Sequence, residues 1–234
     1  EMCIRDSYYG GQYFAVFLTK LSHTKVELTY NLMRTFVAGL AFAMPFSLVY
    51  QMMSDRMKGQ QKSEKVIKGL PFAAGFTAGT AVSIAGNMHY VIYAQIIPLI
   101  EKLTGKEVSS YWFPDATRYI GYNPYREEDR TIHEFPCYSF VLGDLHAHVV
   151  NIMFVLLVIA LLYVWLRGVR KKTVPVETSM KDGKFWKEQL LMPHLLVISV
   201  LLGMFQWTNF WDFVIYYVVT LLSLIHISEP TRPY

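Results

Sequence analysis

The chain has 234 residues, of which 53% are hydrophobic and only 17% are charged. A sequence this apolar does not suit an ordinary soluble domain. The formal net charge of +4 does not indicate nucleic-acid binding either, because the basic residues cluster beside apolar segments, where membrane topology accounts for them.

The two ends of the sequence correspond to one artificial DNA element. Residues 222–232, LSLIHISEPTR, are the translation of a transposase adapter used in sequencing libraries, and the opposite strand translates to the start of the chain, EMCIRD. We therefore expect residues 1–7 and 222–234 to be adapter-derived tails and residues 8–221 to be a fragment of one transmembrane domain. The alternative is a pair of native polar tails. With the tails removed, Cys137 is the only cysteine, which excludes an internal disulfide.

A short aromatic segment, residues 8–22, is followed by four long apolar stretches. A helix needs about 20 residues to cross a bilayer, so we expect residues 8–22 to form an interfacial or re-entrant helix instead. The stretches that reach or approach the spanning length are residues 29–53, 70–100, 149–166 and 190–210, and a further apolar run follows Asp212. The sequence thus predicts an all-α, polytopic transmembrane helical bundle of about five helices, the last one truncated.

Basic residues determine the orientation that we predict. Lysine and arginine are concentrated in residues 55–68 and 167–187, so both connectors should be cytoplasmic. Residues 101–144 then form a loop on the extracytoplasmic side of the cell membrane. Alternation of the helices brings Asn87 and Asn209 to the same side.

The predicted outer loop, residues 101–144, is rich in aromatic residues and contains Pro114, Pro124 and Pro136. Disordered segments are poor in aromatic and order-promoting residues. We therefore expect this loop to fold against the membrane face.

The strongest chemical motif is GDLHAH, residues 143–148, with Glu134 ten residues before Asp144. In an extended backbone Asp144, His146 and His148 point the same way, and their carboxylate and imidazoles suit a divalent metal or proton transfer. In a helix, His146 points elsewhere. The structural alternative is that Asp144 caps the helix beginning near Leu145. Because ionisable residues within a membrane mark functional sites, we take Glu134, Asp144, His146 and His148 as candidate catalytic residues.

Two further motifs have both a structural and a functional interpretation. Asp115 and Arg118 are three residues apart, so they either pair on one helical turn or leave Arg118 to bind an anionic group such as phosphate. Asn209, Trp211 and Asp212 lie where one helix ends and the next begins. There Asp212 either caps a helix and Trp211 anchors it at the interface, or the group binds a polar substrate.

Several motifs, taken in order, resemble the signatures of a family of uncharacterised polytopic membrane proteins named after its Tyr-Tyr-Tyr motif. They are Tyr8-Tyr9-Gly10, Asn87, YWFPDATR, TIHEFPCYSFVLGDLHAH and TNFWDF. The resemblance covers nearly all of residues 8–221. In two respects the chain departs from the family: it begins within the tyrosine motif, and it has Gln12 where the family often has a histidine.

That family in turn resembles the C-type glycosyltransferase superfamily, which includes protein mannosyltransferases and lipid A aminoarabinose transferases. Residues 8–53 carry this similarity, with an aromatic juxtamembrane helix, a break at residues 20–24 and a transmembrane helix that ends in basic residues. Members of the superfamily use polyprenyl-phosphate sugar donors on the outer membrane face. Their catalytic acid usually lies in the first outer loop, which here would precede Tyr8.

The resemblance implies a glycosyltransferase-like enzyme in which Glu134 or Asp144 acts as general base on an acceptor hydroxyl. Arg118, or a divalent metal held by Asp144, His146 and His148, would offset charge on the departing phosphate. Two other functions stay open: a non-enzymatic transporter or envelope assembly component that binds a polar solute, and a metal-dependent hydrolase of lipid-linked substrates. The candidate substrate-binding set is Tyr8, Tyr9, Asn87, Asp115, Arg118, Asn209, Trp211 and Asp212.

Overall fold

The computed structural model describes residues 9–60, 63–118, 120–122, 125–127, 130–170 and 191–228, without the side chains of 169–170 and 226–228. Within these ranges the chain is helical apart from turns, loops and one isolated bridge between Tyr122 and Tyr125, so the predicted all-α fold is confirmed. Tyr8, most of the predicted tails and most of the basic connector at residues 167–187 lie outside the described residues.

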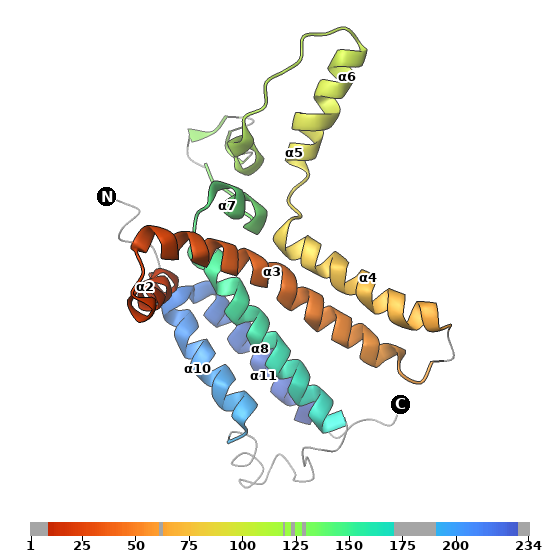
Figure 1. Cartoon of the computed structure of the whole chain (residues 1–234), viewed down its shortest axis with the longest axis vertical. Coiled ribbons are helices and arrows are strands. Elements are labelled where there is room, and N and C mark those ends of the chain that lie inside the picture. The colour runs from red at the N-terminus through yellow and green to blue at the C-terminus, as the bar shows by residue number, and fades with distance from the viewer. Residues whose placement is uncertain are drawn as a thin grey trace.

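The body of the molecule is a bundle of helices that pack side by side (Figure 1). Helix α3 runs against α4, and α8 lies between α3 and the antiparallel pair of α10 and α11. The short helix α2 (Gly10–Ser22) packs against α3, α8 and α10. Its 13 residues span about 20 Å at 1.5 Å per residue, too short to cross a bilayer. The bundle helices are α3 (Val26–Met57), α4 (Glu64–Ser83), α8 (Ala147–Arg170), α10 (Pro193–Thr208) and α11 (Phe210–Ser228).

Close packing of side chains joins the helices. One apolar cluster, which includes the buried Trp165, Ile198 and Phe205, lies between α8, α10 and α11. A second joins α3 to α8 and includes Val37 and Val149, which have no exposed surface. Helices in a bilayer associate through such packing contacts, because lipid tails are as apolar as the side chains themselves.

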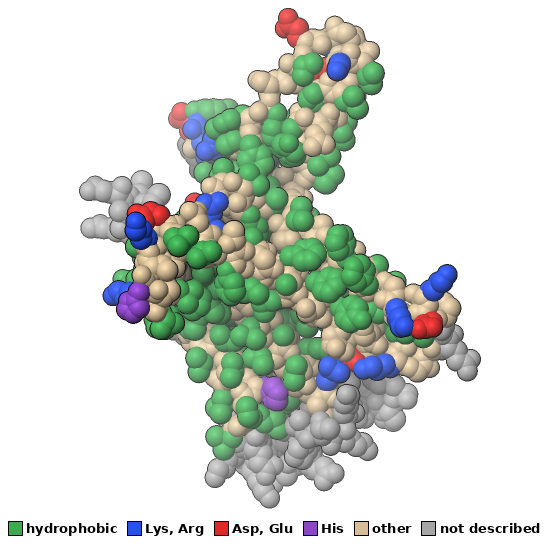
Figure 2. Space-filling view, viewed as in Figure 1, with side chains coloured by type: hydrophobic (Ala, Val, Ile, Leu, Met, Phe, Trp, Pro, Cys, Tyr) green, Lys and Arg blue, Asp and Glu red, His purple; other side chains and the backbone are tan. Residues whose placement is uncertain are grey.

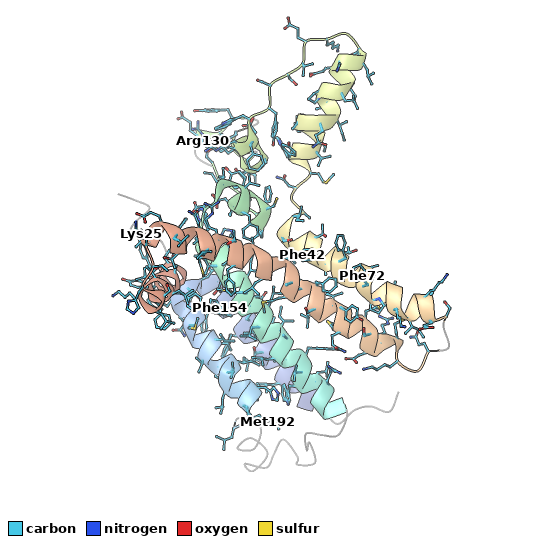
Figure 3. The ribbon with its side chains drawn as sticks, viewed as in Figure 1. Lys25, Phe42, Phe72, Arg130, Phe154 and Met192 are labelled. Atoms are coloured by element: carbon cyan, nitrogen blue, oxygen red, sulfur yellow. The ribbon has the colours of Figure 1, made fainter. Side chains whose placement is uncertain are left out.

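Two glycines allow α4 to approach α3 closely. A Cβ atom at Gly75 would lie 2.8 Å from the carbonyl oxygen of Phe46, and one at Gly79 would lie 2.9 Å from that of Phe42. Small residues four positions apart permit this kind of backbone contact between membrane helices. Aromatic rings surround the contact, among them Phe42 of α3 and Phe72 of α4 (Figure 3).

The outer surface of the bundle is apolar. Helices α3 and α8 are long and apolar enough to cross a bilayer, and the apolar parts of α10 (Pro193–Thr208) and α11 (Phe210–Ile225) are shorter. Large side chains such as Phe36, Phe76 and Val200 remain more than half exposed. Figure 2 shows apolar side chains across the middle of the visible face and charged side chains toward the ends of the helices. This surface fits a lipid environment. The count of about five spanning helices stays a prediction, because it also depends on α4, α10 and α11.

The apolar stretch of residues 70–100 is not one helix in the structure. Helix α4 ends at Ser83, and after a non-helical segment the chain continues as α5 (His89–Val91), the π-helical η1 (Ile92–Ile96) and α6 (Ile97–Leu103). Two contacts fix the break. Gly86 packs so closely on the ring of Phe135 that a Cβ would lie 2.6 Å from a ring carbon, and the Asn87 side-chain amide donates to the carbonyl of Ala116.

The 3-10 helix η2 (Phe113–Thr117) and helix α7 (Pro136–Leu142) lie at one end of the bundle, which we call the loop end, whereas α6 projects away from it (Figure 1). The rings of Phe113 and Tyr138 stack at 5.2 Å, and the His133 N–H donates to the Thr117 carbonyl at 3.0 Å. The part of the loop that contains η2 and α7 therefore packs on itself at the loop end; its position against the membrane face stays a prediction.

The sidedness of the loop end is testable by cysteine labelling. We expect a cysteine at the exposed Lys106 to react with a membrane-impermeant maleimide in intact cells, because this segment should lie outside. A cysteine at Lys68, near the start of α4, should react only after permeabilisation. Both variants carry Ser in place of Cys3 and Cys137, and labelling is read as a gel shift. Labelling of Lys68→Cys with protection of Lys106→Cys would invert the orientation.

Candidate functional site

The centre of the site is the His146 imidazole, which lies between two carboxylates. Its Nε2 atom is 2.9 Å from Oε2 of Glu134 and 2.9 Å from Oδ2 of Asp144. Glu134 comes from the extended chain before α7, whereas Asp144 and His146 come from the connector between α7 and α8. The Nε2 atom of His146 thus links a carboxylate before α7 to a carboxylate between α7 and α8. This arrangement suits proton transfer, because an imidazole both donates and accepts protons near neutral pH.

A glycine turn produces this geometry. Helix α7 ends at Gly143, which has a left-handed φ of 74°. The amides of Gly143 and Asp144 both donate to the Ser139 carbonyl, at 2.8 and 2.9 Å, so the turn satisfies the end of the helix. The left-handed backbone at Gly143 disfavours any side chain there, and a Cβ would also force the Arg34 guanidinium to move.

The structure does not support Asp144 as the cap of α8. The amides of Val149 and Val150 donate to the His146 carbonyl at 3.0 Å, so the first helical hydrogen bonds are made to His146. Among the described residues no backbone amide donates to the Asp144 carboxylate, which instead faces the imidazole.

His148 forms a second layer beneath this cluster. Its ring stacks on that of His146 with centroids 5.8 Å apart, and it lies within electrostatic reach of both Asp144 and Asp212. The Nε2 atom of His148 is buried and makes no hydrogen bond to any described residue.

A hydrogen-bond network anchors the break between α10 and α11 to α8. The fully buried Asn151 donates through Nδ2 to Oδ2 of Asp212 at 2.5 Å and accepts through Oδ1 from the Thr208 hydroxyl at 2.9 Å. Asn209 donates to the same Asp212 oxygen at 3.0 Å and directly precedes α11. Asp212 is not the cap of α11 but lies in its first turn. A negative charge at this position is stabilised by the helix dipole. Trp211 is 69% exposed, as expected of an interface anchor.

The first turn of α2 inserts between α8 and α10 at the loop end. A Cβ on Gly10 would lie 2.7 Å from the Thr208 side chain, and one on Gly11 would lie 2.9 Å from that of Val150. The Gln12 amide donates to the Leu145 carbonyl at 3.0 Å. Tyr9, 39% exposed, directly precedes this turn. The tyrosine motif, the GDLHAH motif and the α10–α11 break are therefore neighbours.

The remaining candidates lie apart from this group. Asn87 has a structural role, because its side-chain amide donates a hydrogen bond to the Ala116 carbonyl. Asp115 is exposed and makes no ion pair with Arg118 within the described ranges; the Arg118 guanidinium stacks over Trp112 at 4.6 Å instead. Burial, together with the nearby Asp115 charge, raises the pKa of Tyr111 above its ordinary value.

Three polar residues of the loop end were not among the predicted site residues: Arg34, Ser139 and Asn151. Arg34 is the only charged residue in the apolar stretch 29–53, and Asn151 is the only amide in the stretch 149–166. Isolated polar groups of this kind in a membrane segment are functional candidates, and that signal was available. Ser139 carried no signal, because serine in a loop is ordinary.

No group of three or more His, Cys, Asp or Glu side chains in the described part of the chain is arranged to hold a metal ion. The Nε2 atom of His146 faces two carboxylates, and that of His148 is buried. We therefore do not assign a metal to Asp144, His146 and His148.

Comparison of the sequence with known proteins identifies a family. The model of the uncharacterised membrane protein family DUF2298 matches residues 4–232. The chain belongs to this family. No curated protein and no solved structure matches it. Membership of DUF2298 identifies the chain as a membrane protein, in agreement with its apolar surface.

The Asn151 network can be tested by removing its amide. In an Asn151→Leu variant, Asp212 and Thr208 lose a buried partner, so we expect the free energy of unfolding to fall by about 1–3 kcal/mol. The measurement is unfolding of the purified protein in lipid nanodiscs. Thr77→Val is the control, because that exposed hydroxyl bonds only to a carbonyl of its own helix. Equal stability of the two variants would contradict the network.

Proposed function

We propose that this DUF2298 protein is a glycosyltransferase-like enzyme that takes its sugar from a polyprenyl-phosphate donor at the outer face of the cell membrane. The observation that carries the proposal is the His146 imidazole between Glu134 and Asp144 at the loop end of the bundle. The resemblance to the C-type glycosyltransferases provides the reaction class, and family membership provides the membrane.

The two carboxylates have different surroundings, which assigns their roles in this proposal. The Asp144 side chain is 53% exposed and that of Glu134 22% exposed, so Asp144 is the group that meets an acceptor. Asp144 takes the proton of the acceptor hydroxyl, and the acceptor oxygen bonds to the anomeric carbon of the sugar. The bond from that carbon to the donor phosphate breaks, and the phosphate leaves with the electron pair. His146 passes the proton on to Glu134.

Other residues of the loop end would bind the substrates. Asp212 bonds to Asn151 of α8 and to Asn209, while Tyr9 and Trp211 are exposed aromatic side chains that suit the apolar faces of a sugar. Arg118, whose guanidinium lies over the Trp112 ring, has N–H donors that suit a phosphate.

One observation favours a transporter as the second candidate. His148, Asp212 and Asn151 continue the polar cluster from the loop end into the apolar bundle. Such a line of polar groups within membrane helices is typical of proton and solute pathways. In that case the same carboxylates would bind a polar solute without turnover.

The test compares isosteric variants in membranes that contain the full-length protein. We expect Glu134→Gln and Asp144→Asn to slow consumption of the polyprenyl-linked sugar pool by roughly 100-fold or more, because general acid–base catalysis contributes at least that factor. Glu107→Gln is the matched control, since this exposed carboxylate lies in the same loop. The readout is the amount of lipid-linked sugar, measured by mass spectrometry.

Wild-type consumption of the lipid-linked sugar by both variants would refute the catalytic assignment. Solute uptake into vesicles that depends on Glu134 and Asp144, with the lipid-linked sugar unchanged, would support the transporter instead.

A further inference from the structure

A groove runs between α3 and α8, in the half of the bundle opposite the loop end. It has a volume of about 450 Å³, which lies within the roughly 300–1,000 Å³ of small-molecule sites. Its wall on α3 extends from Leu40 to Gln51, and its wall on α8 from Leu156 to Arg167. Each wall covers about three helical turns, or roughly 17 Å at 1.5 Å per residue. The hydrocarbon core of a bilayer is about 30 Å thick, so the groove is about as long as one leaflet is deep.

The groove uses faces of α3 and α8 that differ from those packed against the neighbouring helices. Helix α4 contacts the other side of α3, at Phe42 and Phe46. On α8, the side chains of Val158, Leu162 and Trp165 belong to the core shared with α10 and α11. Among the described helices, the groove is therefore open toward the lipid that surrounds the bundle.

The lining of the groove changes from apolar to polar along its length. Its inner part is formed mainly by aliphatic and methionine side chains, among them Leu40, Met44 and Leu156. Its outer part, toward the ends of the two helices, includes Gln51 and Arg167. A phospholipid has the same order of parts, with acyl chains in the hydrocarbon and a charged headgroup at its surface. The groove therefore matches a phospholipid in both length and polarity.

A carboxylate bridge crosses the polar end of the groove. Asp55 of α3 accepts from the Tyr163 hydroxyl at 2.8 Å, and its carboxylate lies 2.8 Å from Nε of Arg167 and 2.6 Å from Nζ of Lys58. A guanidinium has five N–H donors. Among the described residues, the bonds from Arg167 to Asp55 use only donors on Nε and Nη2. Arg167 therefore keeps donors for a second anion.

This end of the bundle carries an excess of positive charge. The last turn of α3 contains Arg56, and the helix ends at Lys58; both side chains are exposed. With Arg167, these cations outnumber the carboxylate of Asp55 by three to one. Figure 2 shows Lys and Arg side chains toward the ends of α3 and α8. The basic connectors predict that this end is cytoplasmic, and the cytoplasmic leaflet is the one that carries anionic lipids.

We propose that this groove binds an anionic phospholipid of the cytoplasmic leaflet, with an acyl chain between α3 and α8 and the phosphate at Arg56, Lys58 and Arg167. Basic pockets between membrane helices on the cytoplasmic side recognise anionic headgroups in this way. The site lies at the opposite end of the bundle from Glu134 and His146, and it does not depend on the proposed transfer reaction.

Lipid binding is measured by native mass spectrometry of the purified full-length protein, titrated with phosphatidylglycerol and separately with phosphatidylcholine. We expect the wild type to bind phosphatidylglycerol about 10-fold more tightly or better. The double variant Arg56→Gln/Lys58→Gln should weaken phosphatidylglycerol binding on the order of 10- to 30-fold, because each cation contributes roughly 5-fold, and leave phosphatidylcholine binding unchanged. Lys65→Gln/Lys68→Gln at the exposed start of α4 is the control with the same change of charge, and should bind like the wild type.

A second variant tests the groove itself. In Ala160→Phe, a ring fills the space between α3 and α8. We expect phosphatidylglycerol binding to weaken by roughly 10-fold, because the acyl chain loses its apolar contacts. Ala73→Phe, on the exposed face of α4, is the control of the same size and should bind like the wild type.

Equal affinity of the wild type for the two lipids would overturn the site, and so would unchanged binding in the Arg56→Gln/Lys58→Gln variant. That variant alters only exposed side chains, so its result stands whether or not Ala160→Phe is stable. Wild-type affinity of a folded Ala160→Phe protein would refute the groove, because the headgroup would then be held at the surface alone. Displacement of the lipid by an equal concentration of glycerol phosphate would refute it too. Equal weakening by the control variants would show that lipid binds all around the bundle, which would also overturn the site.

Discussion

The buried Asn151 amide is the interaction on which the loop end of the bundle depends. Polar groups inside an apolar bundle must find partners within the chain, because lipid offers none. Both polar atoms of the Asn151 amide have a partner: the NH2 group donates to Asp212 and the oxygen accepts from Thr208, at the break between α10 and α11. The first turn of α2 then packs against Thr208 and Val150. Without this anchor, the segments that carry the polar motifs would have no fixed position relative to α8.

The same requirement explains why the chemistry lies at one end. Each helix break at the loop end is closed by a side chain from a remote segment: Asn87 binds the Ala116 carbonyl, and Gln12 binds the Leu145 carbonyl. The turn at Gly143 lets the chain reverse between α7 and α8, and this reversal brings His146 to Glu134. Several buried polar atoms do not follow the pattern, among them the Nε of Arg34, the hydroxyl of Ser139 and the Nε2 of His148, which have no hydrogen-bond partner among the described residues.

The sequence predicted the class of fold and much of the site's location, for physical reasons that apply to particular residues. Uncharged stretches predicted the bundle, and alternation of helices placed Glu134, Asp144 and Asn209 at one end. Contacts between remote residues could not be predicted from the sequence. The break at Gly86 and Asn87, for example, depends on Phe135 and Ala116, so the apolar stretch of residues 70–100 gave no sign of it. Spacing left two interpretations of Arg118 open, and only the structure shows that it lies over Trp112 and does not pair with Asp115.

The central claim is that Glu134 and His146 act as one linked group. A double-mutant cycle measures this directly, with the free energy of unfolding determined in nanodiscs for Glu134→Gln, His146→Gln and the double variant. Residues that share a hydrogen bond show interaction energies of about 0.5–3 kcal/mol, and distant residues show almost none. The geometry of 2.9 Å predicts an interaction energy in that range. Effects of the two substitutions that simply add would contradict the account.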